Sequence, residues 1–235
     1  INNWAVSQIG KEYSHYLLCN NDIEACVPGW LGRMLELGQS PDVGVVGAEL
    51  LYPDRTTIQH AGVCVGAYGA AEHFGKFLRI PDMQSRLGFA EILASNHEVS
   101  AVTAACLLIK REVFEAVSGF DETLAVGFGD VDLCLRVGKL GYRILYCPHA
   151  KLIHHESLTR GKSSGVDPHP GDSALFRHRW HVFLDNGDPY FHPGLDQNST
   201  VWQIRIPMHC SFEIRRRIFE KQAIAAKRPI FRFHS

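Results

Sequence analysis

The sequence predicts an α/β protein whose strands and helices pack in layers. Short apolar runs typical of buried strands alternate along the chain with segments that carry apolar residues at helical spacing. Gly- and Pro-rich breaks separate many of these segments. A chain of 235 residues that is 46% hydrophobic can bury a substantial core, so we expect one main domain with an appendage.

The first quarter of the chain contains two predicted helices and two predicted strands. Residues 3–12 show weak helical periodicity, and the run "HYLLC" at 15–19 is typical of a short buried strand. In "PGWLGRMLELG", Pro28 is placed to begin a helix and Gly38 to end it. The apolar run "VGVVGAELLY" predicts the second strand, at 43–52.

The middle of the chain predicts a hairpin followed by a long loop. Pro53-Asp54 favours a turn into "TTIQHAGVCVG", which indicates a hairpin-like excursion. Residues 66–97 are rich in Gly and poorly periodic, so we expect a long loop with a short helix around Leu87 to Leu93. Long loops of this kind in compact domains are often functional lids.

The second half of the chain returns to regular alternation. A long strand and a short helix that ends near Gly119 are predicted in 98–122. The stretch 127–148 predicts a loop, a helix and a strand, and a final strand ends in His154-His155. A helix is expected at 173–185, after a break rich in Gly, Ser and Pro.

Charge and cysteine content narrow the class of protein. The net charge of −1 and a pI near 7.0 give no support for a nucleic-acid-binding chain. The seven Cys form no C-x-x-C pair, which favours free thiols in a reducing compartment, so we expect a cytoplasmic protein. No run of about 18 apolar residues predicts a membrane-spanning helix.

Three polar clusters lie at predicted strand or helix ends: Asn20-Asn21-Asp22, Asp130 with Asp132, and His154-His155. Each has a purely structural explanation when taken alone. Asp22 can end a strand in an Asx-turn, and Asp130 can be a helix N-cap worth about 1 kcal/mol. Asp132 is spaced to pair with Arg136 one helical turn later, and a His pair after a strand is most often a surface feature.

Together the clusters fit one chemistry. A divalent cation held by a carboxylate and a His neutralises a diphosphate as it leaves. A separate carboxylate can then take the proton from an attacking hydroxyl.

The ordered combination of these motifs resembles a known family. The stretches "LLCNNDIEACVPGWLGRML", "VGVVGAELLYPDRTTIQHAGV" and "SAVTAACLLIKREVFEAVSGFDETLAVGFGDVDLCLRVGKLGYRILYCPHAKLIHHES" look like the C-terminal half of a family 2 glycosyltransferase catalytic domain. The resemblance covers roughly residues 10–195, including "RHRW" and "DPYFHPGL". It implies the GT-A fold, a three-layer α/β/α sandwich with a mixed sheet. It also implies transfer of a sugar, with inversion, from a nucleotide-diphosphate donor to a hydroxyl of a glycan or lipid-linked acceptor.

The resemblance assigns roles residue by residue. Asn20-Asn21-Asp22 matches the family's DXD-type corner, with Asn in place of the first carboxylate and Asp22 as the metal and diphosphate contact. Asp130 is the candidate general base, although Gly129 stands where the family usually has Glu. His154 matches the metal-coordinating His, with His155 as the alternative, and the cofactor would be Mn²⁺ or Mg²⁺.

Four further residues complete the predicted site. Ala104 and Ala105, small residues in the predicted long strand, fall where close approach to the donor sugar is expected. Trp30 and Phe128 are expected to form walls of the acceptor site.

The chain departs from the family at its beginning. The strand–helix–strand–helix half that binds the nucleotide base and ribose does not precede Ile1. We therefore expect residues 1–195 to form a partial GT-A domain with little transferase activity in isolation and a tendency to self-associate through an exposed sheet edge. Residues 196–235 form a basic extension, with Arg215, Arg216 and Arg217. It is either a solvated helix that packs on the core or leads to a further module, or a basic face that contacts an acidic partner or anionic lipid at the inner face of the cell membrane.

Two other classes of function stay open. A metal-dependent phosphoesterase could use Asp22, Asp130 and the His pair, although such sites usually have a denser set of ligands. A carbohydrate-binding or scaffolding module derived from a transferase fold would need no catalysis.

Overall fold

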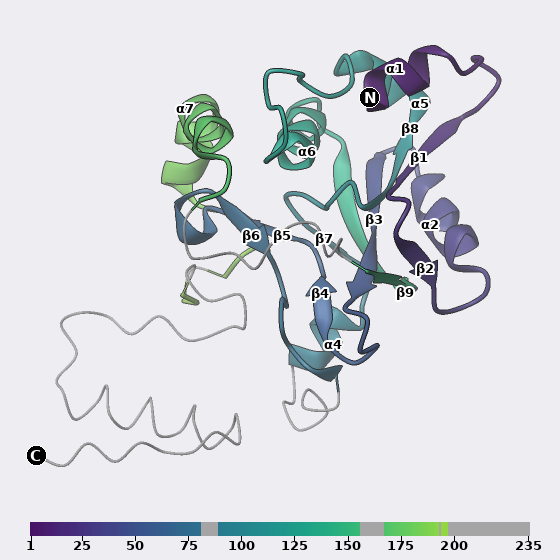
Figure 1. The fold of residues 1–235 in the computed structure, drawn as a ribbon, viewed down its shortest axis with the longest axis horizontal. Helices are drawn as coiled ribbons and strands as arrows, with labels where there is room; N and C mark the ends of the chain where they lie inside the picture. Colours follow the sequence, from purple (N-terminus) through teal and green to yellow (C-terminus); the bar gives the residue numbers. More distant parts are fainter. Residues whose placement is uncertain (81–88, 156–166, 193, 197–235) are drawn as a thin grey trace, which may run out of the picture.

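The computed structural model describes residues 1–80, 89–155, 167–192 and 194–196. These residues fold around one twisted sheet with helices on both faces (Figure 1). The expected basic extension lies outside the described residues from residue 197 onward, and so do Arg215, Arg216 and Arg217.

The main sheet is mixed, as expected. Its strands follow the order β1 (His15–Cys19), β8 (Cys106–Lys110), β3 (Val43–Leu51), β9 (Arg143–His154) and β2 (Ile23–Ala25). β4 (Ile58–His60) also pairs with β3, and β7 (His97–Glu98) pairs with β9. Only the central pair of this sheet, β3 with β9, is parallel. β3 is buried along its whole length, which explains its continuous apolar sequence.

Helices cover both faces of this sheet (Figure 1). On one face lies α2 (Trp30–Gly38), whose Met34 is fully buried against side chains such as Val46. The opposite face carries α5 (Arg111–Ala116), α6 (Gly129–Lys139) and α7 (Pro170–Asn186), and α1 (Asn2–Ser7) lies at the same end as α5. Neighbouring residues of β3 alternate between the two cores, with Val45 in one and Val46 in the other. The three-layer α/β/α prediction is confirmed.

The hairpin prediction at Pro53-Asp54 is confirmed, because β4 pairs antiparallel with the end of β3. The long loop that follows contains more structure than its sequence indicates. β5 (Val63–Val65) pairs with β6 (Ala71–His73) across the short turn η1 (Ala67–Gly69), and α4 spans Phe89–Leu93. β6 was missed because "AEH" shows no apolar alternation, and its order comes from pairing with β5.

Two strand boundaries also differ from the prediction. The long strand expected from residue 98 is broken, because β8 begins only at Cys106 and a turn at Ala104 and Ala105 precedes it. Conversely, the two strands predicted on either side of Pro148 form one strand, β9, which continues past the Pro by a register shift against β3.

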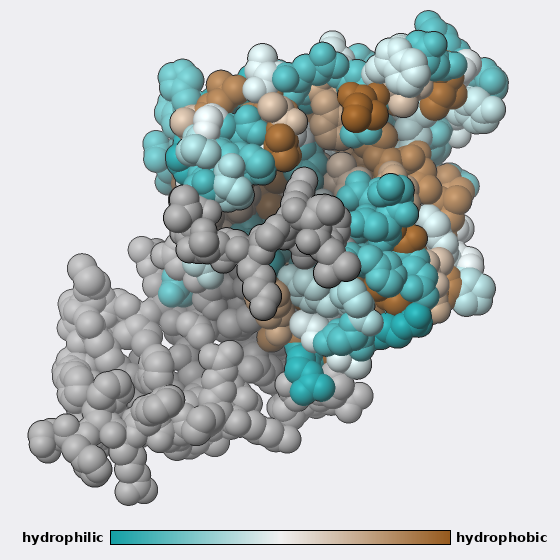
Figure 2. Space-filling view, viewed as in Figure 1, coloured by the Kyte–Doolittle hydropathy of each residue, from teal (hydrophilic) through white to brown (hydrophobic). Residues whose placement is uncertain are grey.

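Hydrophobic side chains also reach the surface. Figure 2 shows brown residues over the region of α1 and α2, and Ile1, Trp4 and Ile9 are exposed there. The self-association expected from the sequence stays a prediction. Among the described residues, no helix has the combined length and apolar character that a membrane crossing would require.

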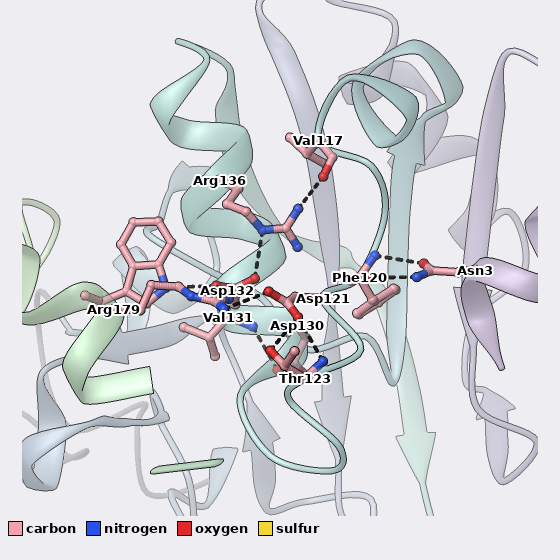
Figure 3. Close-up of polar contacts among 11 residues, drawn as sticks. Asn3, Val117, Phe120, Asp121, Thr123, Asp130, Val131, Asp132, Arg136 and Arg179 are labelled. Carbon is pink, nitrogen blue, oxygen red and sulfur yellow. Dashed lines mark hydrogen bonds and ion pairs between the residues drawn. The ribbon is translucent and has the colours of Figure 1, made fainter. Parts of the chain in front are cut away.

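A buried carboxylate joins α6 to α7 (Figure 3). Asp132 has no exposed surface, and it accepts hydrogen bonds from Arg136 Nε at 2.7 Å, Arg179 at 2.9 Å and Trp180 Nε1 at 3.0 Å. Arg179 also pairs with Asp121 at 2.7 Å. The predicted pair of Asp132 with Arg136 is thus confirmed, and the "RHRW" segment supplies two further partners.

We expect Asp132→Asn to destabilise the fold by roughly 3 kcal/mol, because it leaves buried donors facing a neutral amide. The control is Asp121→Asn, which removes the more exposed partner of the same Arg179 and should cost within about 1 kcal/mol. Chemical denaturation of the two variants and the wild type would measure both free energies. Equal losses would contradict the distinction between the buried and the exposed carboxylate.

Candidate active site

A polar cavity of about 870 Å³ opens at the end of β1. Its lining combines the predicted corner with residues from several distant segments: Asn20, Asn21, Asp22, Gln59, His73, Lys76, Thr103, Ala104, Ala105, Asp130 and His154. Besides His154, six of the predicted site residues line this cavity. The fold therefore brings the Asn20-Asn21-Asp22 corner and Asp130 into one space.

The Asn20-Asn21-Asp22 corner connects β1 to β2, the two ends of the strand path. Asn20 N–H donates to Ala105 O at 2.9 Å, and Asp22 O accepts from His155 N–H at 3.0 Å. Backbone hydrogen bonds therefore hold the corner at both ends, so its position does not depend on its side chains. This leaves the Asp22 carboxylate to face the cavity.

His154 lies at the end of β9, against this corner. Its Nδ1 is 2.8 Å from Gln59 Oε1, which only accepts, so Nδ1 carries a proton. Its Nε2 lies 3.2 Å from Asn20 Nδ2, a donor, and so is an acceptor in the neutral ring. A metal-binding His has this arrangement, with one nitrogen held by a hydrogen bond and the other presenting a lone pair.

Asp22 Oδ1 lies 3.2 Å from the same Nε2. The contact is an ion pair only if His154 is protonated; in the neutral ring, Nε2 accepts from Asn20. Asp22 Oδ1 is also buried without a hydrogen-bond partner among the described residues. Two electron-rich atoms facing one another at this distance fit a cation between or beside them.

The two groups do not form a complete metal site by themselves. No set of three or more His, Cys, Asp or Glu side chains arranged to hold a metal occurs within the described parts of the chain. Mg²⁺ sites with one or two carboxylates usually take their remaining ligands from substrate phosphates and water.

Asp130 lies in the first turn of α6 and lines the same cavity (Figure 3). Its Oδ1 accepts from Val131 N–H at 2.9 Å, and its Oδ2 accepts from Ala104 N–H at 3.1 Å. Each carboxylate oxygen keeps a second lone pair, so Asp130 can still accept a proton from a hydroxyl. The bond to Ala104 ties the carboxylate to the bend before β8.

Three predicted site residues lie elsewhere. His155 Nε2 is 3.0 Å from Oε2 of Glu24, whose Oε1 pairs with Arg55, and His155 lies outside the cavity. Trp30 begins α2 and packs against the core on the opposite face. Phe128 does not line the main cavity; it stacks on Phe176 with ring centroids 4.9 Å apart and borders a smaller cavity with Asp130.

Sequence reasoning missed several lining residues. Gln59, His73, Lys76 and Thr103 come from the excursion after β3 and from the bend before β8. Asp172 was missed as well, although it accepts hydrogen bonds from the N–H groups of residues 125–127, just before Asp130. None of these residues belongs to a spaced motif, so only the folded chain reveals them.

The described residues have the GT-A fold, which a solved glycosyltransferase structure shares. GalNAc-T7, whose structure contains UDP, GalNAc and Mn²⁺, matches with a TM-score of 0.51 and 12% identity, over 77% of this chain and 34% of that one. At that identity the likeness concerns the fold alone.

Sequence relatives include a protein named for O-antigen biosynthesis and a named rhamnosyltransferase. No family model matches the chain. It is 41% identical over 218 residues to the uncharacterized protein y4gI of Sinorhizobium fredii and 38% identical over 206 residues to the O-antigen biosynthesis protein RfbC of Myxococcus xanthus. It is 27% identical over 192 residues to the N-acetylglucosaminyl-diphospho-decaprenol L-rhamnosyltransferase of Mycobacterium tuberculosis. These matches cover 89%, 87% and 80% of this chain, and the expected resemblance to glycosyltransferases is confirmed.

The chain spans only part of these relatives. It matches 23% of y4gI, 16% of RfbC and 59% of the rhamnosyltransferase.

The last residue of β1 carries an activated thiol beside the corner. Cys19 faces Cys106 directly across the β1–β8 pair. A hydrogen bond with the Cys106 thiol lowers the pKa of Cys19 to about 7, against opposing effects of burial and of the nearby Asp22 charge. Burial instead raises the pKa of Cys26, on the other side of the corner.

We therefore expect iodoacetamide to alkylate Cys19 with a rate that rises through about pH 7. Cys106→Ala should move this midpoint upward, toward that of an ordinary thiol. Peptide-resolved mass spectrometry follows Cys19 and Cys26 in the same sample, so Cys26 is the internal control. Identical pH profiles at the two thiols would contradict the assignment.

Proposed function

We propose that this chain is catalytic in an inverting glycosyltransferase of the family 2 type. It would transfer a glycosyl group from a nucleotide-diphosphate sugar to a hydroxyl acceptor in the synthesis of a surface polysaccharide or related glycan. The observation that carries the proposal is the unsatisfied Asp22 Oδ1 beside the Nε2 of His154, in the same cavity as Asp130. That arrangement offers a cation site and a separate base.

Proteins similar to this chain support the polysaccharide context. RfbC is named for O-antigen biosynthesis, and the mycobacterial relative is named as a rhamnosyltransferase acting on a lipid diphosphate. By analogy, a glycan or lipid-linked acceptor is proposed here.

A divalent cation, Mn²⁺ or Mg²⁺, would be held by Asp22 and His154. When bound, it would neutralise the charge that develops on the departing nucleoside diphosphate. Gln59 would hold the His154 ring by the 2.8 Å contact at Nδ1, and the Nε2 lone pair that accepts from Asn20 at 3.2 Å would turn to the ion instead.

Asp130 would act as the general base. As a carboxylate it would take the proton from the acceptor hydroxyl while the oxygen attacks the anomeric carbon. The glycosidic bond forms as the bond to the diphosphate oxygen breaks, so a single displacement inverts the anomeric carbon. Ala104 and Ala105 lack bulk beyond Cβ, which leaves room for the donor sugar near this carboxylate.

The alternatives are less well supported. A metal-dependent phosphoesterase usually needs a denser set of metal ligands than Asp22 and His154 supply among the described residues. A scaffolding module would not need the unsatisfied carboxylate oxygen of Asp22, which has a cost when buried without a ligand. Cytoplasmic location and membrane contact through Arg215, Arg216 and Arg217 stay predictions.

The proposal predicts metal-dependent binding of a nucleoside diphosphate. Calorimetric titration of uridine and thymidine diphosphates should give binding that strengthens on addition of Mn²⁺. Asp22→Ala should abolish the metal-dependent part, because it removes the charged ligand. His155→Ala is the matched control, since His155 pairs with Glu24 outside the cavity. If wild type and Asp22→Ala bind equally, the corner is not the diphosphate site.

A second prediction separates catalysis from binding. Asp130→Asn should leave nucleoside diphosphate affinity within about twofold, since the amide oxygen can still accept the Ala104 N–H. Turnover, measured as nucleoside diphosphate released in the presence of acceptor, should fall by about 10²–10⁴-fold where the wild type turns over. An Asp130→Asn variant with wild-type turnover would exclude Asp130 as the base.

A further inference from the structure

Two cysteines face one another across strands β1 and β8, directly before the Asn20-Asn21-Asp22 corner. Cys19 ends β1 and is exposed, whereas Cys106 begins β8 and is buried. The strands run antiparallel, and their register places these two residues opposite one another. Both carry free thiols, and together they are called the thiol pair below.

The backbone hydrogen bonds along this ladder show which kind of position the thiol pair occupies. Beside the pair, Asn20 N–H donates to Ala105 O at 2.9 Å. At the other end of β1, Arg111 N–H donates to Ser14 O at 2.9 Å. Hydrogen-bonded and non-hydrogen-bonded pairs alternate along an antiparallel ladder. Both bonds give the same phase of this alternation, and they make the thiol pair a non-hydrogen-bonded pair.

Residues in such a pair lie close enough for a disulfide. Their Cα atoms are about 4.5 Å apart, and their side chains lie on the same face of the sheet. Disulfides join residues whose Cα atoms are roughly 4.4–6.8 Å apart. A hydrogen bond already joins the two thiols, so the sulfur atoms face one another. The thiol pair can therefore be linked with little movement of either strand.

The two thiols differ in access and in acidity. Cys19 is exposed, so a dissolved oxidant reaches it, whereas Cys106 is only 1% exposed. The hydrogen bond between them lowers the pKa of Cys19 to about 7 and raises the pKa of Cys106. Because the thiolate is the nucleophile, Cys19 is the thiol that attacks first. Cys106 lies behind it, in position to attack second.

We propose that Cys19 and Cys106 are a redox-active pair that a small-molecule disulfide, such as oxidised glutathione, converts to an intramolecular disulfide. The Cys19 thiolate attacks one sulfur of the small disulfide, whose S–S bond breaks and releases one thiolate. Cys106 then attacks the Cys19 sulfur of this mixed disulfide, and its proton leaves with the second half of the oxidant as a thiol. Two electrons thus pass from the thiol pair to the small disulfide.

The new bond lies next to the candidate active site. Asn20 and Ala105, one position further along the ladder, both line the cavity that contains Asp22. The end of the β1–β8 pair that carries the corner is therefore a redox-sensitive position. This proposal goes beyond the proposed function, because the thiol exchange needs neither a metal nor a sugar donor. A failure of either proposal is thus distinguishable from a failure of the other.

Oxidation of the whole chain with oxidised glutathione tests the proposal. The reduced, native protein is incubated with the oxidant at neutral pH, free thiols are alkylated, and the peptides are identified by mass spectrometry. The wild type should yield the Cys19 peptide linked to the Cys106 peptide, with the loss of two hydrogen atoms. Dithiothreitol should reverse the link. Cys106→Ala should instead keep glutathione on Cys19, because no second thiol displaces it.

Two further variants complete the experiment. Cys19→Ser should take up no glutathione on Cys106, since that thiol is buried. Cys26→Ser is the matched control, because it removes the partly exposed thiol on the other side of the corner and should form the link as the wild type does. Three results would each overturn the proposal: a wild type that keeps glutathione on Cys19, one that links Cys19 to a different cysteine, or one in which both thiols stay reduced.

Discussion

The parallel pairing of β3 with β9 is the constraint on which the site depends. These two strands share eight register pairs from Val43 to Leu51, and their inward side chains are buried on both faces. β3 holds β8 on its other side, and β9 holds β2 at its far end. The Asn20-Asn21-Asp22 corner joins strands anchored on these two sides, so its position follows from the centre of the sheet. His154 reaches the corner because β9 continues past Pro148 without ending.

Hydrogen bonds behind the cavity wall orient two histidine rings. Nδ1 of His154 donates to Gln59, which leaves Nε2 as an acceptor beside Asp22. Behind the cavity wall, Nδ1 of His73 lies 2.7 Å from Nδ1 of the buried His60.

The sequence predicted the parts of this site that follow strand and helix ends. Asp22 follows a strand, Asp130 begins a helix and His154 ends a strand, so their position on the fold could be inferred before any contact was known. Asp132 could be paired with Arg136 from its spacing alone. Gln59, His60 and His73 could not be found this way. They lie on short strands whose order depends on pairing with β3 and β5, and short polar strands give no periodic signal.

Trp30 shows the converse limit. Its position near the corner in sequence suggested an acceptor wall, but the helix it begins packs on the far face of the sheet. Few residues separate Trp30 from the corner, but strand β2 lies between them, and after it the chain continues in the helix layer on the other face of the sheet. Trp30 is therefore close to the corner in sequence but separated from it by the sheet.

The segment before Asp130 has a conformation that only its neighbours explain. Phe128 has φ of 63°, in the left-handed region, which costs a non-Gly residue about 1–2 kcal/mol. Stacking on Phe176 and the hydrogen bonds that Asp172 accepts from residues 125–127 oppose this cost. Those N–H groups lower the pKa of the Asp172 carboxyl, so it remains an acceptor as pH falls below its usual range. Helix α6 thereby begins where the Asp130 carboxylate accepts the Ala104 N–H. The left-handed conformation of Phe128 accompanies this position of the carboxylate at the cavity.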